Sequence, residues 1–302
     1  MVQTLDFDKF TINLSSGQLS SNAIFDYETK QQYQIVVRVS DNGNAPRTTV
    51  VPVTVNILDL QDNPPLFQVL NTEVSINENV ANILVATLKA DDADSVKSYN
   101  FVLADNADSS AFSVQTVINE ARVYLNTALD YEVKIRYTFQ VTTQGMIGNI
   151  LYTTASVTVN VLDMNDNPPV IGQYSATVTV LETVAIGSAL SYLTATDADG
   201  TSPNNRIEYK VQSVSPNSVS NLFYVGEKSA ILTVASSLQA DRTVNTYTVN
   251  VIAFDLGTPS LTATGTVTVT VKRNTAPVFQ GSSTTIPAVN ENIAISTSSR
   301  KF

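Results

Sequence analysis

The stretch that decides the fold is Asp163-Met-Asn-Asp-Asn-Pro-Pro169, a junction rich in Asp and Asn that follows alternating apolar and polar residues. The same pattern occurs earlier as Asp59-Leu-Gln-Asp-Asn-Pro-Pro65, and later in a degenerate form as Val271-Lys-Arg-Asn-Thr-Ala-Pro277. The second proline recurs at intervals of 104 and 108 residues. A nearly constant period indicates a tandem array of similar units. The densest groups of hard oxygen ligands lie at the joints between those units.

The junctions divide the 302 residues into four parts. We predict the C-terminal half of one unit at 1–63, complete units at 64–167 and 168–277, and the start of a further unit at 278–302. The sequence therefore has the organisation expected of an excerpt from a longer protein, because Met1 falls in the middle of a unit.

Each unit is rich in strand signals. Strict alternation, the pattern of a strand with one buried face, occurs before each junction at 51–57, 155–161 and 265–271. A second strand is predicted upstream in each unit, at 33–39, 137–141 and 247–253, and turn sequences such as Asp41-Asn-Gly-Asn-Ala-Pro46 separate the two. Short strands at this spacing, without a Cys…Trp…Cys pattern, predict an all-β protein of tandem Ig-like Greek-key sandwiches.

The composition excludes several classes of function. The net charge of −10 disfavours nucleic acid, whose phosphates require a basic surface. The chain has no Cys, His or Trp, which leaves neither thiol nor imidazole chemistry and no Trp platform for a sugar in a glycosidase cleft. We therefore do not expect an enzyme. No apolar run reaches the ~18 residues of a membrane span, and Asn13-Leu-Ser15 is the only N-glycosylation sequon.

Acidic residues recur at fixed places in the units. Asp26-Tyr-Glu28 and Asp130-Tyr-Glu132 precede the proline pairs by the same distance. A single Glu lies early in each unit, at Glu78, Glu182 and Glu291. The pairs Asp92-Ala-Asp94 and Asp197-Ala-Asp199 follow it, and Asp41 and Asp255 stand eight residues after a strand Tyr.

This combination resembles the tandem extracellular repeats of the cadherin superfamily over nearly the whole chain. The early Glu, the D-x-D pair, the D-[RY]-E triplet, the late D-x-G and the D-x-N-D-N-P-P linker are all present. The resemblance implies calcium ions at the joints between repeats. The chemistry agrees, because Ca²⁺ takes six to eight oxygens from carboxylates, carbonyls and Asn amides, and carboxylates packed together without a cation repel one another.

In the family, a joint takes the early Glu, the triplet and the linker from the upper repeat, and the D-x-D pair, an Asn and the late Asp from the lower one. The middle joint is complete and is expected to hold about three calcium ions. Its implied ligands are Glu78, Asp130, Glu132, Asp163, Asn165, Asp166, Asn167, Asp197, Asp199, Asn204 (with Asn205 adjacent) and Asp255.

The first joint is impaired. Its implied ligands are Asp26, Glu28, Asp59, Gln61, Asp62, Asn63, Asp92 and Asp94. Gln61 replaces the linker Asn, which is a mild change if the ligand is a backbone carbonyl. Gly145 stands where the late Asp is expected, and the segment after Asp94 is too short to supply the Asn. We expect the calcium site nearest the second unit to be weak or empty.

The third joint is predicted to be calcium-free. Ala240-Asp241-Arg242 stands in place of the triplet, and Val271, Arg273, Asn274 and Thr275 replace the linker ligands. Glu182 alone remains of the upper set, while Arg242, Lys272 and Arg273 would repel a cation.

The resemblance implies calcium-dependent cell–cell adhesion by the extracellular part of a plasma-membrane protein, with other cadherin ectodomains as homophilic or heterophilic partners. Calcium would stiffen this segment into a rod or spacer with a flexible joint near 271–277. Because Trp is absent, a protocadherin-like or giant cadherin is expected. The alternative is a microbial adhesin or carbohydrate-binding module with cadherin-like repeats.

Overall fold

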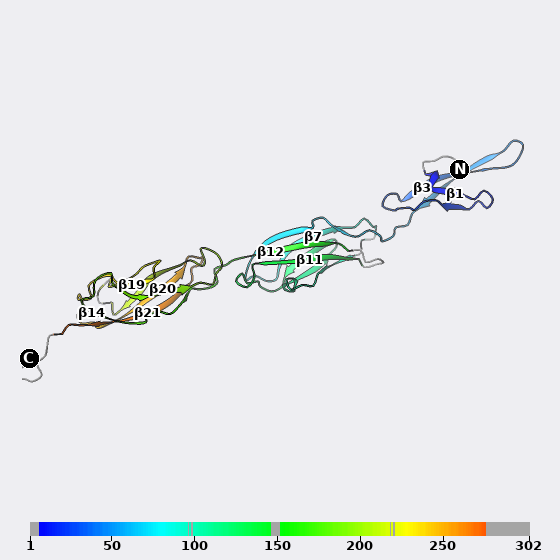
Figure 1. Ribbon diagram of the computed structural model, residues 1–302. Coiled ribbons are helices and arrows are strands. Elements are labelled where there is room, and N and C mark those ends of the chain that lie inside the picture. Colours follow the sequence, from blue (N-terminus) through cyan, green and yellow to red (C-terminus); the bar gives the residue numbers. More distant parts are fainter. Residues whose placement is uncertain are drawn as a thin grey trace, which may run out of the picture. The chain divides into compact units, whose positions relative to one another are not determined.

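A computed structural model describes residues 6–95, 97, 99–145, 152–217, 219 and 221–275 (Figure 1). Glu291, Pro277 and the further unit predicted at 278–302 lie outside the described residues. The chain separates into two compact units. One contains 1–167 together with 198–205 and 257–259, and the other contains 168–197, 206–256 and 260–302.

The N-terminal part consists of two antiparallel hairpins. β1 (Phe10–Ile12) pairs with β2 (Leu19–Ser21), after the short 3-10 helix η1 (Phe7–Lys9), and β3 (Gln32–Ser40) pairs with β4 (Thr48–Asn56). Phe10, Tyr33 and Ile35 form a small buried core between them.

Residues 66–162 form a sandwich of two four-stranded sheets. One sheet has the order β5 (Leu66–Phe67), β7 (Ile83–Asp91), β10 (Glu120–Leu125), β9 (Phe112–Val117). The other has the order β6 (Asn71–Asn77), β12 (Thr154–Leu162), β11 (Arg136–Gly145), β8 (Tyr99–Leu103), and η2 (Ser109–Ala111) precedes β9. Alternate residues of β12, Val157, Val159 and Val161, point into the core between the sheets, so the predicted alternation is confirmed.

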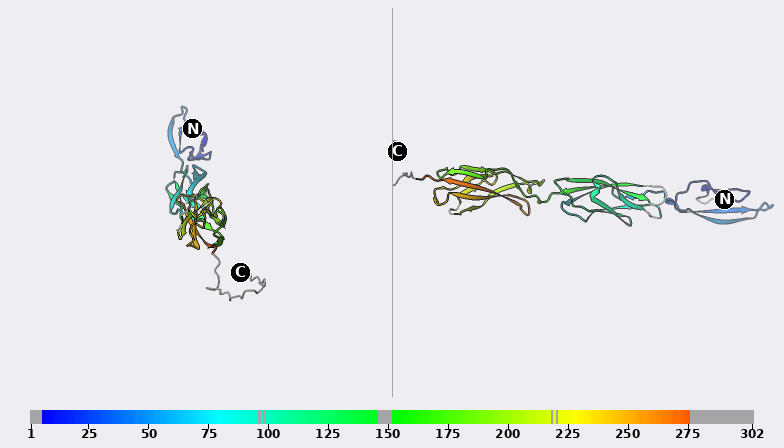
Figure 2. Two further views of the ribbon diagram at one scale, coloured as in Figure 1. Left: turned by 90° about the vertical axis from the view of Figure 1, so that its left-hand side faces the viewer. Right: turned by 90° about the horizontal axis from the view of Figure 1, so that it is seen from below.

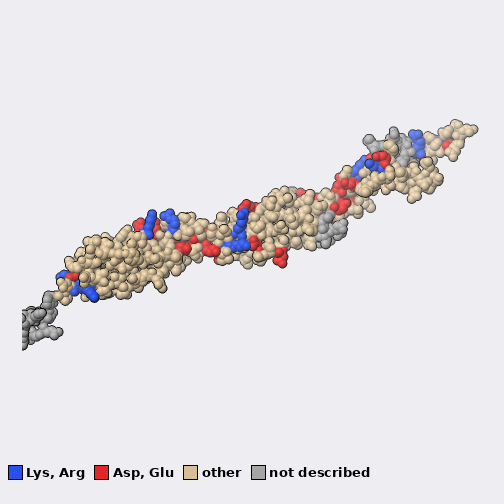
Figure 3. All heavy atoms as spheres, viewed as in Figure 1, with Lys and Arg blue, Asp and Glu red and all other residues tan. Residues whose placement is uncertain are grey.

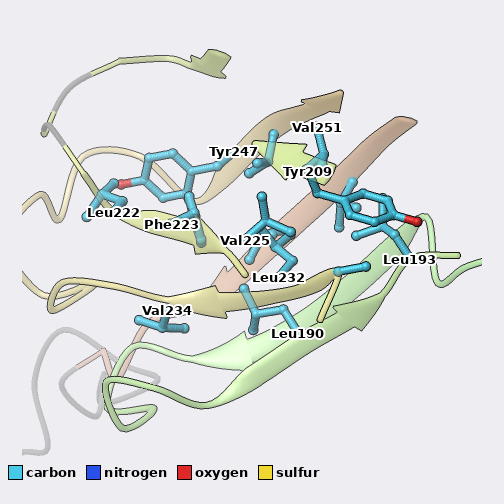
Figure 4. Close-up of a cluster of buried hydrophobic side chains, with 14 of the residues drawn as sticks. Leu190, Leu193, Tyr209, Leu222, Phe223, Val225, Leu232, Val234, Tyr247 and Val251 are labelled. Atoms are coloured by element: carbon cyan, nitrogen blue, oxygen red, sulfur yellow. The ribbon is translucent and has the colours of Figure 1, made fainter. Parts of the chain in front are cut away.

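The third sandwich repeats this plan. Its larger sheet has the order β14 (Thr177–Leu181), β21 (Thr262–Lys272), β20 (Thr246–Asp255), β17 (Ile207–Ser215). The opposite layer contains β15 (Ala189–Tyr192), β19 (Ile231–Val234) and β18 (Phe223–Val225), with the pair β13 (Val170–Ile171) and β16 (Ala195–Thr196) beside it. Tyr247 and Phe223 meet edge to face at 5.6 Å in the buried cluster of Figure 4.

In both complete sandwiches the last strand pairs in parallel with an early strand of the same sheet. Asn77 of β6 is opposite Leu162 of β12, and Leu181 of β14 is opposite Lys272 of β21. The remaining strand pairs of these sandwiches are antiparallel, and the strands run along the long dimension of each domain (Figure 2). The all-β Greek-key sandwich predicted from the sequence is confirmed.

Candidate metal-binding junctions

Glu78, at the end of β6, is the buried centre of the junction that follows the second sandwich. Its side chain is 2% exposed, and its two oxygens accept hydrogen bonds from the backbone N–H groups of Tyr131 at 2.7 Å and Met164 at 2.8 Å. One carboxylate therefore ties the Asp130-Tyr-Glu132 triplet to the linker. Oxygens of Glu78, Glu132 and Asp166 lie within 4.8 Å of one another, close enough to share a cation.

A second acidic group adjoins the first through Glu132. Oxygens of Glu132, Asp163 and Asp199 also lie within 4.8 Å of one another. Asp163 accepts hydrogen bonds from Thr201 N at 2.8 Å and Asn204 Nδ2 at 3.2 Å. The linker and the loop 198–205, which belong to the same compact unit, are thus held together around these carboxylates.

Asn167 completes this arrangement. Its backbone N–H and its amide Nδ2 both donate to Asp199 Oδ1, at 3.1 and 3.0 Å, and Nδ2 also donates to Asp166 at 2.7 Å. Asn79 Nδ2 donates to the other oxygen of Asp166. These amides fix the orientation of the Asp166 and Asp199 carboxylates.

The carboxylates of this junction lie close enough to repel one another, and this raises the pKa of some of them. Partial burial, together with the neighbouring Glu78, Asp166 and Asp163 carboxylates, raises the pKa of Glu132 to about 7. Burial, reinforced by Asp163 and Asp166, also raises the pKa of Asp199. A divalent cation would remove this repulsion, and an all-oxygen donor set of carboxylates and amides fits Ca²⁺.

Two glycines allow close approach, one to the triplet and one to the linker. A Cβ on Gly200 would lie 2.1 Å from the Tyr131 ring, and a Cβ on Gly257 would lie 2.2 Å from the Asn165 amide. Asn165 Nδ2 also donates to Pro259 O at 2.6 Å. A larger residue at 200 would displace the Tyr131 ring, and one at 257 would displace the Asn165 side chain.

The acidic clusters among the described residues do not include every predicted ligand. Asp130 is exposed and its Oδ1 accepts the Val133 N–H at 3.0 Å. Asp255 is fully buried at the end of β20 and its Oδ2 accepts the Leu261 N–H at 2.9 Å. Asp197 and Asp255 belong to the other compact unit.

The first junction has the same local pattern with fewer groups. Oxygens of Glu28, Asp59 and Asp94 lie within 4.8 Å of one another. Asn63 Nδ2 donates to Asp94 at 2.8 Å and Ser95 N donates to Asp59 at 3.0 Å, as Asn167 and Thr201 do in the later junction. Burial, reinforced by the neighbouring Asp59 and Asp62 carboxylates, raises the pKa of Glu28.

The remaining predicted groups of this junction lie nearby. Burial, reinforced by Asp94, raises the pKa of Asp92, whose Oδ1 accepts the Asp94 N–H at 3.0 Å. Asp62 accepts the Asn63 amide at 3.0 Å, Gln61 is half-buried, and Asp26 caps the Thr29 N–H at 3.0 Å. Gly145 pairs with Tyr99, the register position that Asp255 takes opposite Ile207, so the expected late Asp is absent from this position.

Strand register corrects the alignment of the third junction. Glu182 N donates to Lys272 O and Asn274 N to Glu182, as Glu78 N donates to Leu162 O and Met164 N to Glu78. Arg273 therefore occupies the position of Asp163. Counting from the proline had placed Val271 there, which was wrong, because Val271 is the last buried residue of β21 and corresponds to Val161 of β12.

The triplet of the third sandwich is aligned by the same means. Tyr247 pairs with Val269 as Tyr137 pairs with Val159. Arg242 therefore stands at the position of Glu132, as the sequence predicted. Figure 3 shows basic side chains gathered beside the C-terminal end of the described chain.

Comparison with known proteins decides the family. The sequence profile described as "Cadherin domain" matches residues 1–58, 72–162 and 176–272. The chain belongs to the cadherin family. Cadherin-99C of Drosophila melanogaster is 33% identical over 262 residues, which are 87% of this chain and 15% of that protein. Protocadherin-23 of Homo sapiens is 29% identical over 276 residues, 90% of this chain and 8% of the relative. The chain thus spans a small part of the curated relatives it matches.

Solved structures agree with the cadherin fold. Mouse cadherin-23 EC22-24 superposes with a TM-score of 0.71 at 25% identity, over 88% of this chain and 83% of that one. Protocadherin gammaB7 EC3-6 gives a TM-score of 0.72 at 24% identity, over 87% and 62% of the two chains. These cadherin repeats are an extracellular segment of a membrane-anchored type of protein. Among the described residues, no helix of this cadherin is long and apolar enough to cross a membrane.

Sequence reasoning missed several partners in the junctions. Ser95 and Thr201 hydroxyls also contact Asp59 and Asp163, and Asn79 contacts Asp166. The Asn in Asn77-Glu-Asn79 was a visible signal, whereas Ser and Thr in loops are too common to single out.

Proposed function

We propose that this segment serves calcium-dependent cell–cell adhesion as a calcium-stiffened rod or spacer of a cadherin ectodomain. The observation that carries the proposal is the pair of acidic clusters sharing Glu132, in which linker, triplet and D-x-D loop converge within 4.8 Å. Glu78, Glu132, Asp163, Asp166 and Asp199 would hold the ions. Asp130, Asn165, Asn167, Asp197, Asn204 and Asp255 would complete their coordination.

Calcium would act by binding the joint in one arrangement. Without metal, repulsion between the carboxylates opposes their convergence. A ligand that binds only the ordered state stabilises it by RT ln(1 + [L]/Kd), about 2.7 kcal/mol at a hundredfold excess over Kd. The stiffened array would hold an adhesive region away from the membrane, and the partners would be other cadherin ectodomains, homophilic or heterophilic.

The joints are proposed to differ in strength. The middle joint would hold about three ions. The first joint would be weaker, because Gly145 supplies no carboxylate at the register position of Asp255. The joint near 271–277 would bind no calcium and act as an elbow, since Arg242 and Arg273 replace Glu132 and Asp163. A longer chain with a complete following repeat would show no calcium-dependent straightening there by small-angle scattering.

Calorimetric calcium titration tests the proposal. Asp163→Ala/Asp166→Ala is compared with the parent and with Glu208→Ala/Glu227→Ala, which removes the same charge outside the acidic clusters. We expect the first variant to lose about three ions and the control none. A parent that binds no calcium at millimolar concentration, or equal losses in both variants, would contradict the proposed mechanism.

The alternative, a microbial adhesin or carbohydrate-binding module, is not favoured by relatives that are animal cadherins. Glycan-array binding at fixed calcium distinguishes the two functions, since a spacer would bind no glycan.

A further inference from the structure

Glu182, at the end of β14, is a buried carboxylate between two arginines. Its side chain is 3% exposed. Arg242 Nη2 lies 3.0 Å from one of its oxygens, and Arg273 Nη1 lies 3.6 Å from the other. The Asn274 N–H also donates to Glu182, at 3.2 Å. Within the described chain, this carboxylate already has cationic and neutral donors.

Arg273 does more than pair with Glu182. Its side chain is only 11% exposed, and it donates to the backbone carbonyls of Leu238, Asp241 and Val244. Its Nε donates to Asn245 Oδ1 at 3.3 Å. A planar guanidinium has five N–H groups in a fixed fork. Here that fork fastens the loop 238–245 to the chain that leaves β21.

The equivalent end of the second sandwich has the opposite charge. Register places Glu182 at the position of Glu78, Arg242 at that of Glu132 and Arg273 at that of Asp163. In the second sandwich those positions are three carboxylates, whose mutual repulsion an added cation would relieve. In the third, two guanidinium groups occupy the same framework.

We infer that Arg273 is a built-in counter-ion that closes this end of the third sandwich, so that the order of loop 238–245 is independent of calcium. The inference concerns the fold of the repeat itself and does not rest on the proposed function of the joints. Arg242 also donates to Glu182, at 3.0 Å, but it contributes less to the order of the loop, because its side chain is 65% exposed and solvent screens its charge.

Hydrogen exchange of the whole chain, followed by mass spectrometry, tests the inference. Removing Arg273 leaves the buried Glu182 carboxylate with the exposed Arg242 as its cationic partner, and it removes the donor to three carbonyls of loop 238–245. Arg273→Gln should therefore raise exchange in 238–247 by at least about tenfold, which corresponds to about 1.4 kcal/mol. The matched control Arg242→Gln, on the same carboxylate, should change it by less than about threefold.

The double variant Glu182→Gln/Arg273→Gln keeps the test informative if Arg273→Gln unfolds the whole sandwich. Removing the stranded carboxylate should restore part of the protection in 238–247 and in β20. The counter-ion role is wrong if the double variant recovers no protection relative to Arg273→Gln. It is also wrong if Arg273→Gln exchanges like the parent.

Chelation of calcium separates this inference from the proposed function. In the parent, exchange in 238–247 should be unchanged, while 130–134 and 163–167 should exchange faster. If neither region responds, the calcium mechanism of the joints fails and the counter-ion role stands on the variants. If 238–247 responds as strongly as 163–167, the counter-ion inference is overturned.

Discussion

Glu78 and Glu182 occupy equivalent positions at the ends of β6 and β14, yet their neighbours differ in sign. Acidic groups surround Glu78, whereas guanidinium groups of Arg242 and Arg273 flank Glu182. The backbone contacts of both carboxylates to the following linker are conserved between the two sandwiches, at 2.8 and 3.2 Å. Side-chain charge, rather than backbone geometry, therefore distinguishes the two ends.

At the residue scale, the raised pKa of Glu132 predicts a pH dependence of the metal-free protein. Between its ordinary pKa of 4.5 and the folded-state pKa of about 7, the folded state holds more protons than the unfolded state. Unfolding therefore releases protons, and stability falls as the pH rises through this window. We expect Glu132→Gln to remove this fall, measured by thermal unfolding at low ionic strength because Glu132 is exposed. A parent that gains stability relative to Glu132→Gln across the window would contradict the assignment.

Gly257→Ala tests the close approach of Asn165. The added methyl would lie 2.2 Å from the Asn165 amide carbon, so the Asn165 side chain must shift. Overpacking costs about 1–3 kcal/mol, and we expect calcium affinity measured by calorimetry to fall by roughly tenfold or more. Gly43→Ala is the control, because its Cβ would meet its nearest neighbour at an ordinary 3.5 Å. Equal affinities in the two variants would show that the linker tolerates displacement.

The junction residues could be predicted in part because calcium-binding chemistry requires acidic residues at repeated spacing. The triplet residue Glu132 and the linker residue Asp163 were predicted as ligands and do lie together. The third junction was misaligned by two residues because its linker is shorter and the count started from the proline. The apolar alternation ends at Val271 in this unit and at Val161 in the preceding one. Aligning these two valines gives the correct register of the third junction. The packing of Tyr131 on Gly200 could not be predicted, since it depends on tertiary approach.

At the element scale, the strands that precede the junctions supply the cores. Valines at alternate positions of β12 and β21 are fully buried, which explains why those strands were visible in the sequence. The short strands β13 and β16, and the positions of η1 and η2, carry no such periodicity and depend on their neighbours. Propensity is a weak guide for such pieces because packing decides their conformation.

A core residue of β11 and a surface ion pair just before this strand should differ in their effect on stability. Phe139 is 1% exposed and its ring centroid lies 4.6 Å from that of Phe112. Phe139→Ala should lower the free energy of unfolding of the second sandwich by about 3–5 kcal/mol. Lys134, which precedes β11, pairs with Asp108 at the surface, and Lys134→Ala should cost less than about 1 kcal/mol. Denaturant unfolding measures both, and similar losses would mean that the ion pair is more important than its exposure indicates.

At the scale of the whole molecule, the uneven distribution of ligands predicts an uneven response to calcium. The chain carries a net charge of −10, so without metal the repulsion between acidic groups opposes an ordered arrangement of the joints. We expect small-angle scattering to show a narrower distribution of the radius of gyration when calcium is added. Asp163→Ala/Asp166→Ala should abolish most of that change, whereas Glu208→Ala/Glu227→Ala should preserve it. An unchanged response in the first variant would place the stiffening elsewhere.

The parallel pairing of β6 with β12, and of β14 with β21, has a mechanical consequence. In the second sandwich, tension applied through the chain passes the two-residue strand β5 and then acts on β6 from one end and on β12 from the other. These two strands are neighbours over seven register pairs, from Asn71 opposite Ser156 to Asn77 opposite Leu162. A pull along two parallel neighbours shears them, so their hydrogen bonds share the load instead of opening one at a time like a zipper. β14 and β21 repeat this geometry in the third sandwich. Because forced unfolding is governed by the unfolding rate, each complete repeat is arranged to resist extension along its strands.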